Sequence, residues 1–173
     1  MTFIERQKIF FVGTAADQGR VNISPKGLDS LHIIDGQRLA WLNLTGSGNE
    51  TSAHVQQNPR MTLMFCAFDG EPLLLRLYGT AREVTSADSQ WDELAGLFTD
   101  IPGRRQIFDM TVDLVVTSCG FGVPLYNYDG DRDALIKWAE KKGDHGIRKY
   151  WEKNNQFSLD NYPTGIISGE TGD

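Results

Sequence analysis

The segment from Leu44 to Thr51 has the composition of a loop that could hold a phosphate group. It reads Leu44-Thr45-Gly46-Ser47-Gly48-Asn49-Glu50-Thr51 and leads from a predicted strand end into a predicted helix. Glycines let backbone N–H groups approach a ligand closely, and a helix N-terminus adds unpaired donors and a favourable dipole. The same residues also fit a tight turn followed by an Asn49 N-cap, the commoner use of such a sequence. The capped turn is therefore the favoured interpretation of this segment alone, and phosphate binding is the alternative.

A second segment with possible chemistry is Ser24-Pro25-Lys26-Gly27, which comes just after a predicted strand. Lys26 could supply a compact cation to a phosphate, and Gly27 allows a close approach. A lone lysine of this kind is usually an exposed turn residue. Its pairing with the glycine loop is what makes a phosphate site worth proposing.

Arg76 and the loop 118–124 are candidates for contact with a ligand. Arg76 lies in an apolar strand, where a charge needs a partner, a ligand or a subunit interface. Asp113 is an equally good structural partner for it. The loop contains Gly120 and Phe121 and could line a flat aromatic ligand, or it could be a point where two backbones cross.

Composition and spacing exclude several other functions. The net charge is −6, which disfavours general binding to nucleic acid or to anionic membranes. The three histidines have no metal-ligand spacing, and no convincing acid–base residue stands out. The longest apolar runs are far shorter than a membrane span, and no signal peptide is visible. These features predict a soluble cytoplasmic protein with no metal site.

The elements that would position these residues are mainly strands. Apolar runs and period-2 alternation predict strands over 9–15, 21–24, 39–44, 61–68, 73–84 and 110–117. Helices are predicted over 3–8, 50–57, 89–98, 131–142 and 147–154. Hairpin-like links join the strands without the regular strand–helix alternation of a parallel sheet. The fold class is therefore α+β, mainly β, with an antiparallel barrel decorated by helices.

The order of these parts resembles the pyridoxamine 5′-phosphate oxidase-like family of FMN-binding split barrels. The resemblance covers residue 3 to about residue 124. The residues that carry it are Phe11-Val12-Gly13-Thr14, Val21-Asn22-Ile23-Ser24-Pro25-Lys26, Leu44-Thr45, Asn58-Pro59-Arg60-Met61-Thr62-Leu63-Met64-Phe65 and Leu77-Tyr78-Gly79-Thr80-Ala81. The oxidase's C-terminal Trp and Arg motif is absent, so the resemblance implies a branch other than the true oxidase.

The resemblance implies a homodimer with FMN in clefts between the two chains. It places Lys26 at the flavin phosphate and Leu44-Thr45 beside the cofactor. Glu50-Thr51 stands where the oxidase has an Arg-Lys pair for the phosphate, so another mode of binding is needed. We expect Ser47, the backbone N–H groups of Gly48 and Asn49, and Thr51 to compensate, together with Lys26.

The expected function is that of an FMN-dependent oxidoreductase that acts on a small-molecule substrate with a separate reductant. The alternatives are a module that stores or senses a flavin, the deazaflavin F420 or haem without turnover, and a structural dimer with an empty cleft. The expected organisation is a split-barrel core over residues 1–128 and a helical extension over 129–173, packed on the same domain.

Overall fold

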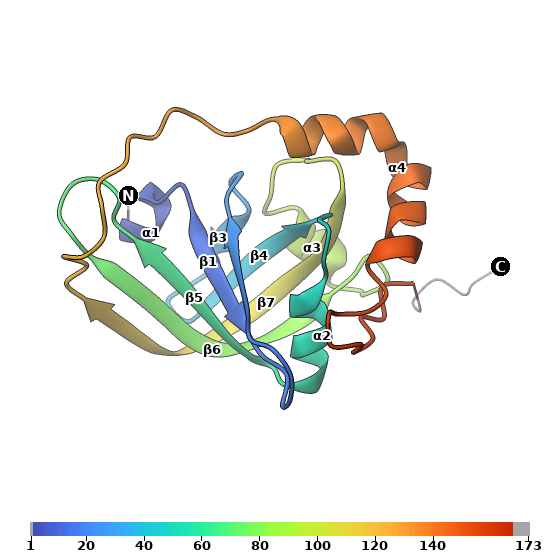
Figure 1. Ribbon diagram of the computed structural model, residues 1–173, viewed down its shortest axis with the longest axis horizontal. Helices are drawn as coiled ribbons and strands as arrows, with labels where there is room; N and C mark the ends of the chain where they lie inside the picture. The colour runs from blue at the N-terminus through green and yellow to red at the C-terminus, as the bar shows by residue number, and fades with distance from the viewer. Residues whose placement is uncertain (1, 168–173) are drawn as a thin grey trace.

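The structure is a computed structural model that describes residues 2–167 of the 173-residue chain (Figure 1). In chain order, its elements are α1 (Phe3–Arg6), β1 (Phe10–Thr14), β2 (Asn22–Lys26), β3 (Leu31–Ile33), β4 (Arg38–Leu44), α2 (Glu50–Gln57), β5 (Arg60–Cys66), β6 (Leu74–Val84), α3 (Trp91–Ala95), β7 (Arg104–Ser118) and α4 (Ala134–Asn154). The predicted mainly-β class is confirmed, because one antiparallel sheet forms the body of the molecule.

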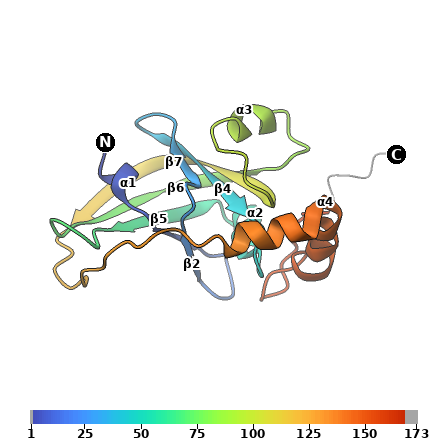
Figure 2. The same cartoon turned by 90° about the horizontal axis from the view of Figure 1, so that it is seen from above.

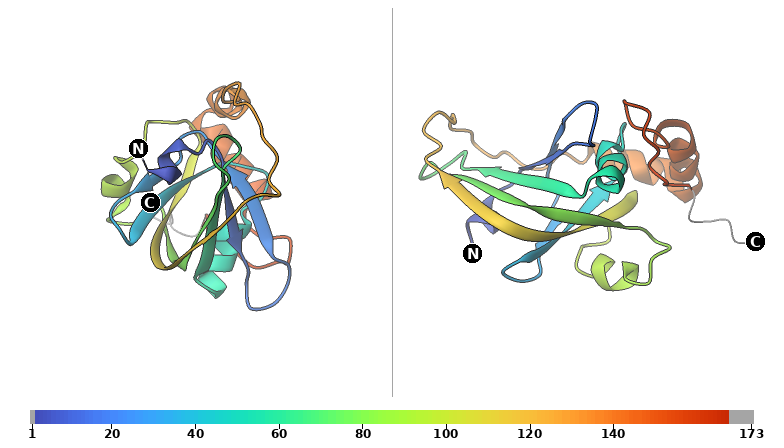
Figure 3. Two further views of the ribbon diagram at one scale, coloured as in Figure 1. Left: turned by 90° about the vertical axis from the view of Figure 1, so that its left-hand side faces the viewer. Right: turned by 90° about the horizontal axis from the view of Figure 1, so that it is seen from below.

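The sheet is curled into an open half-barrel. Its strand order is β2-β1-β5-β6-β7-β4-β3, so β2 and β4 stand five places apart. A flat sheet would hold two such strands roughly 24 Å apart. Instead, the Nζ atom of Lys26 on β2 lies 4.9 Å from the centre of the Trp41 ring on β4. The two ends of the sheet therefore approach one another, as the end-on view in Figure 3 shows, and we call the gap between β2 and β4 the seam.

The concave side of the half-barrel holds the main apolar core. Period-2 alternation directs one face of each strand inward, as on β6, where Leu75 and Leu77 are buried. The other members of the cluster are Phe10, Val12, Leu39, Trp41, Val55, Met61, Leu63, Phe65, Ala81, Phe108 and Met110. Trp41 stacks on Phe108 with 4.9 Å between ring centres. This packing fixes the two strands that form one side of the seam.

A second, smaller core lies on the other face of β4 and β7 under α3. Leu94, Ala95 and Phe98 pack there against Leu42 and Ile107, as the predicted helical spacing requires. Figure 2 shows α3 and α4 on opposite sides of the sheet.

This double coverage explains the one large error in the predicted strands. β7 begins at Arg104, whereas the sequence predicted a start at residue 110. The prediction missed residues 105–110 because they are all buried and show no alternation. A strand buried on both faces loses the period-2 pattern. The short strand β3 was also missed.

The C-terminal helix α4 is bent. Gly143 has φ 60° and ψ 172° and separates two helical parts, as the two predicted helices indicated. Within residues 2–167, no helix is long and apolar enough to span a bilayer.

Candidate anion-binding site

A cavity of about 360 Å³ opens in the seam beside the N-terminus of α2, and we call it the seam cavity. Its walls come from β2, from the end of β4 with the loop that follows, from the first turn of α2 and from β7. The lining residues are Asn22, Ser24, Lys26, Asn43, Leu44, Gly46, Ser47, Gly48, Asn49, Glu50, Thr51 and Arg105. The curl of the sheet thus brings the glycine loop and Lys26 together, as the phosphate hypothesis requires.

The alternation of β2 selects which of its side chains face the seam cavity. Asn22, Ser24 and Lys26 are half-buried and line it. Ile23 and Pro25 point to the other face of the strand and are exposed. The edge strand β2 therefore presents a polar face to the seam cavity and an apolar face to the opposite side.

Asn49 occupies the N-cap position of α2, but its side chain makes no capping hydrogen bond. The predicted N-cap position is therefore confirmed, although the side chain does not form the hydrogen bond that usually accompanies it. The Asn49 side chain is 2% exposed, and its Nδ2 and Oδ1 atoms have no hydrogen-bond partner within the described residues. Leaving a buried amide unpaired costs about 1–3 kcal/mol. A buried amide in the wall of a cavity, next to the free N–H groups of a helix start, is suited to contact a bound anion.

Arg105 of β7 is the second cation of the seam cavity and was not predicted from the sequence. It is 6% exposed, and burial lowers the pKa of its guanidinium to about 10. Its Nε donates to Gln106 Oε1, and its Nη1 donates to the Gly48 carbonyl and to Asn155 Oδ1. All three acceptors are neutral. Glu83 attracts the guanidinium electrostatically but forms no ion pair with it in the part of the chain that is described.

Lys26 is a cation that forms no ion pair with a carboxylate within residues 2–167. Burial and, to a smaller extent, the nearby charge of Arg105 together lower the pKa of its amine to about 8. Its Nζ atom lies over the Trp41 ring and makes a cation–π interaction with it. Two positive groups therefore share one cavity and destabilise each other, which an anion bound between them would reverse.

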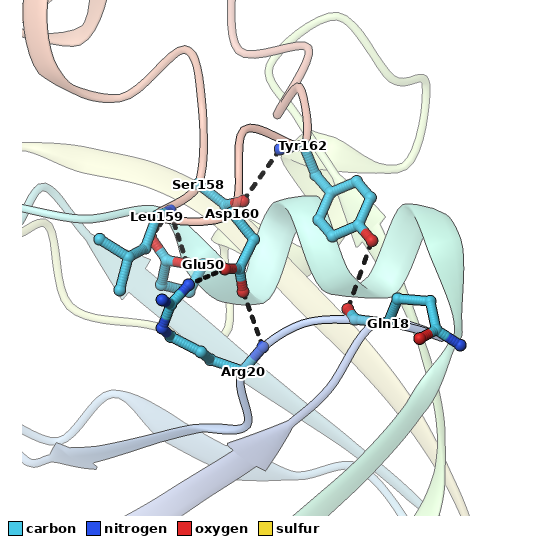
Figure 4. A network of polar contacts seen from close by, with 7 residues as sticks. All are labelled: Gln18, Arg20, Glu50, Ser158, Leu159, Asp160 and Tyr162. Carbon is cyan, nitrogen blue, oxygen red and sulfur yellow. Dashed lines mark hydrogen bonds and ion pairs between the residues drawn. The ribbon is translucent and has the colours of Figure 1, made fainter.

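Glu50 lines the same cavity, and its carboxylate accepts a hydrogen bond from a neighbouring segment of the chain. Both of its oxygens accept the Leu159 backbone N–H at 3.1 Å, from the segment that follows α4. Figure 4 shows this contact within a network that joins the segment to α2 and to the β1–β2 turn. By the resemblance described above, Glu50 stands where the oxidase has a basic residue. Here its carboxylate binds the segment that follows α4.

These groups fit a phosphate monoester. Such a group carries about two negative charges and three strong acceptor oxygens. Lys26, Arg105, the first N–H groups of α2 and the Asn49 and Thr51 side chains can all donate. The Nη2 atom of Arg105 has no acceptor within residues 2–167 and is available for this purpose.

Arg76 lies elsewhere, on the convex face of the sheet. There it lines a wide apolar depression of about 620 Å³, which we call the outer cavity, with Phe11, Ile23, Met64 and Tyr78 among its walls. Its Nη1 donates to the Ser118 hydroxyl at 3.0 Å. Asp113 lines the same cavity, but the ion pairs among the described residues do not include one between it and Arg76.

The remaining predicted residues lie outside the seam cavity. The Thr45 hydroxyl donates to the Gly103 carbonyl and accepts from Trp151 Nε1. Gly27 lies in a third cavity beside α1. Gly120 has φ 66° and abuts the Leu73 backbone, so this position requires glycine. Phe121 follows it and is 80% exposed. The end of β7, which precedes this loop, lies at the other end of the sheet from α2 in Figure 1.

The curled antiparallel half-barrel agrees with the split-barrel architecture that the resemblance implied. The pyridoxamine 5′-phosphate oxidase family model matches residues 1–119, and the chain belongs to this family. The predicted family is therefore confirmed. The pyridoxamine 5′-phosphate oxidase family protein ustO of Aspergillus flavus is 35% identical over 91% of this chain and 71% of its own length.

Solved structures share the fold at low sequence identity. HupZ of Group A Streptococcus superposes with a TM-score of 0.53 at 21% identity, covering 66% of this chain and 92% of its own. An FMN-binding protein from Syntrophomonas wolfei superposes with a TM-score of 0.50 at 12% identity, covering 66% and 78%. These similarities identify the fold and do not identify the ligand of this chain.

Proposed function

We propose that this protein binds FMN with the flavin phosphate in the seam cavity and acts as a flavin-dependent oxidoreductase on a small molecule. The observation that carries the proposal is the pair Lys26 and Arg105. A buried cation and a half-buried cation in one cavity, neither ion-paired within the described residues, are unfavourable unless an anion joins them. A phosphate supplies that anion.

Membership of the pyridoxamine 5′-phosphate oxidase family supports FMN as the molecule that carries this phosphate. The similar fold of the FMN-binding protein from Syntrophomonas wolfei agrees with it. When bound, the flavin supplies the redox chemistry. This chain's residues would hold and orient it: Lys26 and Arg105 by charge, and the start of α2 by its N–H groups.

The proposal includes a homodimer formed through the outer cavity. Val21 and Ile23 of the outer cavity are 70% and 68% exposed, and Leu114 on the adjoining stretch of β7 is 53% exposed. Apolar patches of this kind are usually covered by a partner. A second copy would cover this one and give the flavin ring an apolar environment, with Arg76 at its edge.

The experiment that tests the proposal starts with the visible spectrum of the untagged protein and mass spectrometry of any released molecule. Stoichiometric FMN is the expected result. A colourless protein that also refuses added FMN would contradict it, and a haem or F420 spectrum would replace FMN with that cofactor. Reduction of the bound flavin by NADH or NADPH distinguishes an oxidoreductase from a storage module, in which the flavin would not cycle.

A further inference from the structure

We infer that Asn155 is a positioning residue for the phosphate site, because it holds Arg105 and the glycine loop in one arrangement. Asn155 follows α4 and lies beyond residue 119, where the family match ends. The inference rests on the phosphate role of the seam cavity proposed above. It adds that the C-terminal segment, and not the barrel alone, sets the affinity of that cavity for phosphate.

The first observation is that every polar atom of the Asn155 side chain is used. The residue is fully buried, at 0% exposure. Its Oδ1 accepts from Arg105 Nη1 at 2.9 Å, and its Nδ2 donates to the carbonyls of Gly46 at 3.1 Å and Ser47 at 3.4 Å. One neutral amide therefore joins the cation of the cavity to the loop that forms its wall.

The second observation concerns the direction of the loop's peptide groups. The carbonyls of Gly46 and Ser47 point to Asn155, and the carbonyl of Gly48 points to Arg105. In a trans peptide the N–H of the next residue points the opposite way, and the described chain has no cis peptide bond. Holding these carbonyls thus turns the N–H groups of Ser47 and Gly48 away from Asn155 and the N–H group of Asn49 away from Arg105. Within residues 2–167, none of these three N–H groups donates to a backbone carbonyl.

The third observation is the charge of the acceptors. Asn155 orients Arg105 without neutralising it, since an amide oxygen carries no net charge. A carboxylate in its place would pair with the guanidinium and weaken its attraction for an anion. With asparagine at position 155, the Arg105 guanidinium keeps its full positive charge, and its Nη2 atom can donate to an anion.

The segment that contains Asn155 is itself fastened to both sides of the cavity. Leu159 N–H binds Glu50 at the start of α2, and Tyr162 Oη donates to the Gln18 carbonyl in the β1–β2 turn (Figure 4). Asp160 pairs with Arg20 beside β2. Thr164 accepts from Ser52 and Gln56 of α2 through its carbonyl. These contacts stabilise the position from which Asn155 acts.

The test compares affinities for FMN and riboflavin, which lacks the phosphate, by fluorescence titration of the full chain. For Asn155→Ala we expect FMN affinity to fall about tenfold or more while riboflavin affinity stays within about twofold. Asn154→Ala is the matched control, because the exposed Asn154 bonds only to the Tyr150 carbonyl of its own helix. It should leave both affinities unchanged. A merely structural role for Asn155 would lower both affinities together, and that result would overturn the inference.

Asn155→Asp keeps the shape of the side chain. It tests the positioning role of Asn155 if the alanine variant does not fold. It should lower FMN affinity about tenfold, because it neutralises Arg105 and removes the Nδ2 donor. An unchanged ratio of FMN to riboflavin affinity would overturn the positioning role. Thermal stabilisation by inorganic phosphate is measured in parallel on the wild-type chain. If neither FMN nor phosphate binds the wild type, the proposed function fails and the inference falls with it.

Discussion

The seam cavity and the outer cavity lie on opposite faces of β2 and differ in almost every physical property. The seam cavity is small, polar and charged. The outer cavity is wide and mainly apolar, with Arg60, Arg76 and Asp113 as its charged members. One strand serves both, because alternate residues of β2 face opposite ways.

In the proposed dimer, this difference would separate what one chain supplies from what a second copy adds. Both cations of the seam cavity belong to this chain, so under the proposed function it would bind a phosphate before any dimer forms. The outer cavity exposes apolar surface that water penalises, so a partner would stabilise it. Single substitutions can change one of these cavities and leave the other intact.

Removing the charge of Arg105 should have the largest effect on phosphate recognition. For Arg105→Met we expect FMN affinity to fall about a hundredfold, since a charge-assisted hydrogen bond contributes up to about 3 kcal/mol. Riboflavin affinity should change little. Arg104→Met is the control, because its guanidinium bonds outside the cavity, to Asp100 and the Thr99 carbonyl. Equal losses for FMN and riboflavin would show that Arg105 acts on the fold and not on the phosphate.

A charge on the convex face should break the proposed dimer and spare the seam cavity. Ile23→Asp places a carboxylate at the exposed apolar side of β2, where a second copy would bury it at a high cost. Sedimentation analysis should then show a monomer that is still stabilised by inorganic phosphate. Leu97→Asp, in the turn that follows α3, should stay dimeric. A monomeric wild-type protein, or an Ile23→Asp dimer, would refute this interface.

Lys26 links affinity to pH and stability. Its amine loses its proton through about pH 8 in the folded chain, against an ordinary value of 10.5. FMN affinity should therefore fall as pH rises from 7 to 9, while the phosphate stays doubly charged. Lys26→Met should weaken FMN binding about tenfold at pH 7 and abolish this pH dependence.

The same variant should stabilise the protein without ligand. Below pH 8 the unfolded chain holds the Lys26 proton more tightly than the folded one, so the charged amine destabilises the fold. Stability should rise from pH 8 towards 10.5 as the folded amine discharges. Lys26→Met should therefore add about 1–3 kcal/mol to the free energy of unfolding at pH 7. Chemical denaturation measures it, with Lys8→Met, at an exposed lysine over Tyr128, as the control. A loss of stability in Lys26→Met would contradict the strain assigned to this site.

Glu50→Gln should have the smallest effect and the opposite sign. An amide oxygen can still accept the Leu159 N–H, while one negative charge leaves the wall of the seam cavity. We expect FMN affinity to rise about two- to threefold at low salt, with less change at high salt, which screens exposed charges. Titrations at two salt concentrations measure the difference. A marked fall in affinity would mean that Glu50 contacts the ligand directly.

Much of the architecture could be predicted from local patterns. The helix Glu50–Gln57 was predicted with its observed bounds, because a glycine-rich loop and Asn58-Pro59 mark its two ends. The alternation of β6 was also predicted, since only one of its faces is buried on the concave side. The first half of β7 was missed because both of its faces are buried. Residue preference predicted Asn49 at the N-cap of α2, and Asn49 occupies that position, but this preference could not predict that its buried side chain makes no capping hydrogen bond.

The sequence by itself determined the mainly-β class, the family, the glycine loop and Lys26 as a possible phosphate contact. Only the tertiary structure decided that Arg105 completes the seam cavity and that Asn155, 50 residues further on, orients it. The physical reason is that periodicity and residue preference specify which face of its own element a side chain occupies. Which elements then meet depends on the curl of the whole sheet and on the path of the chain after residue 119, and no local pattern encodes either.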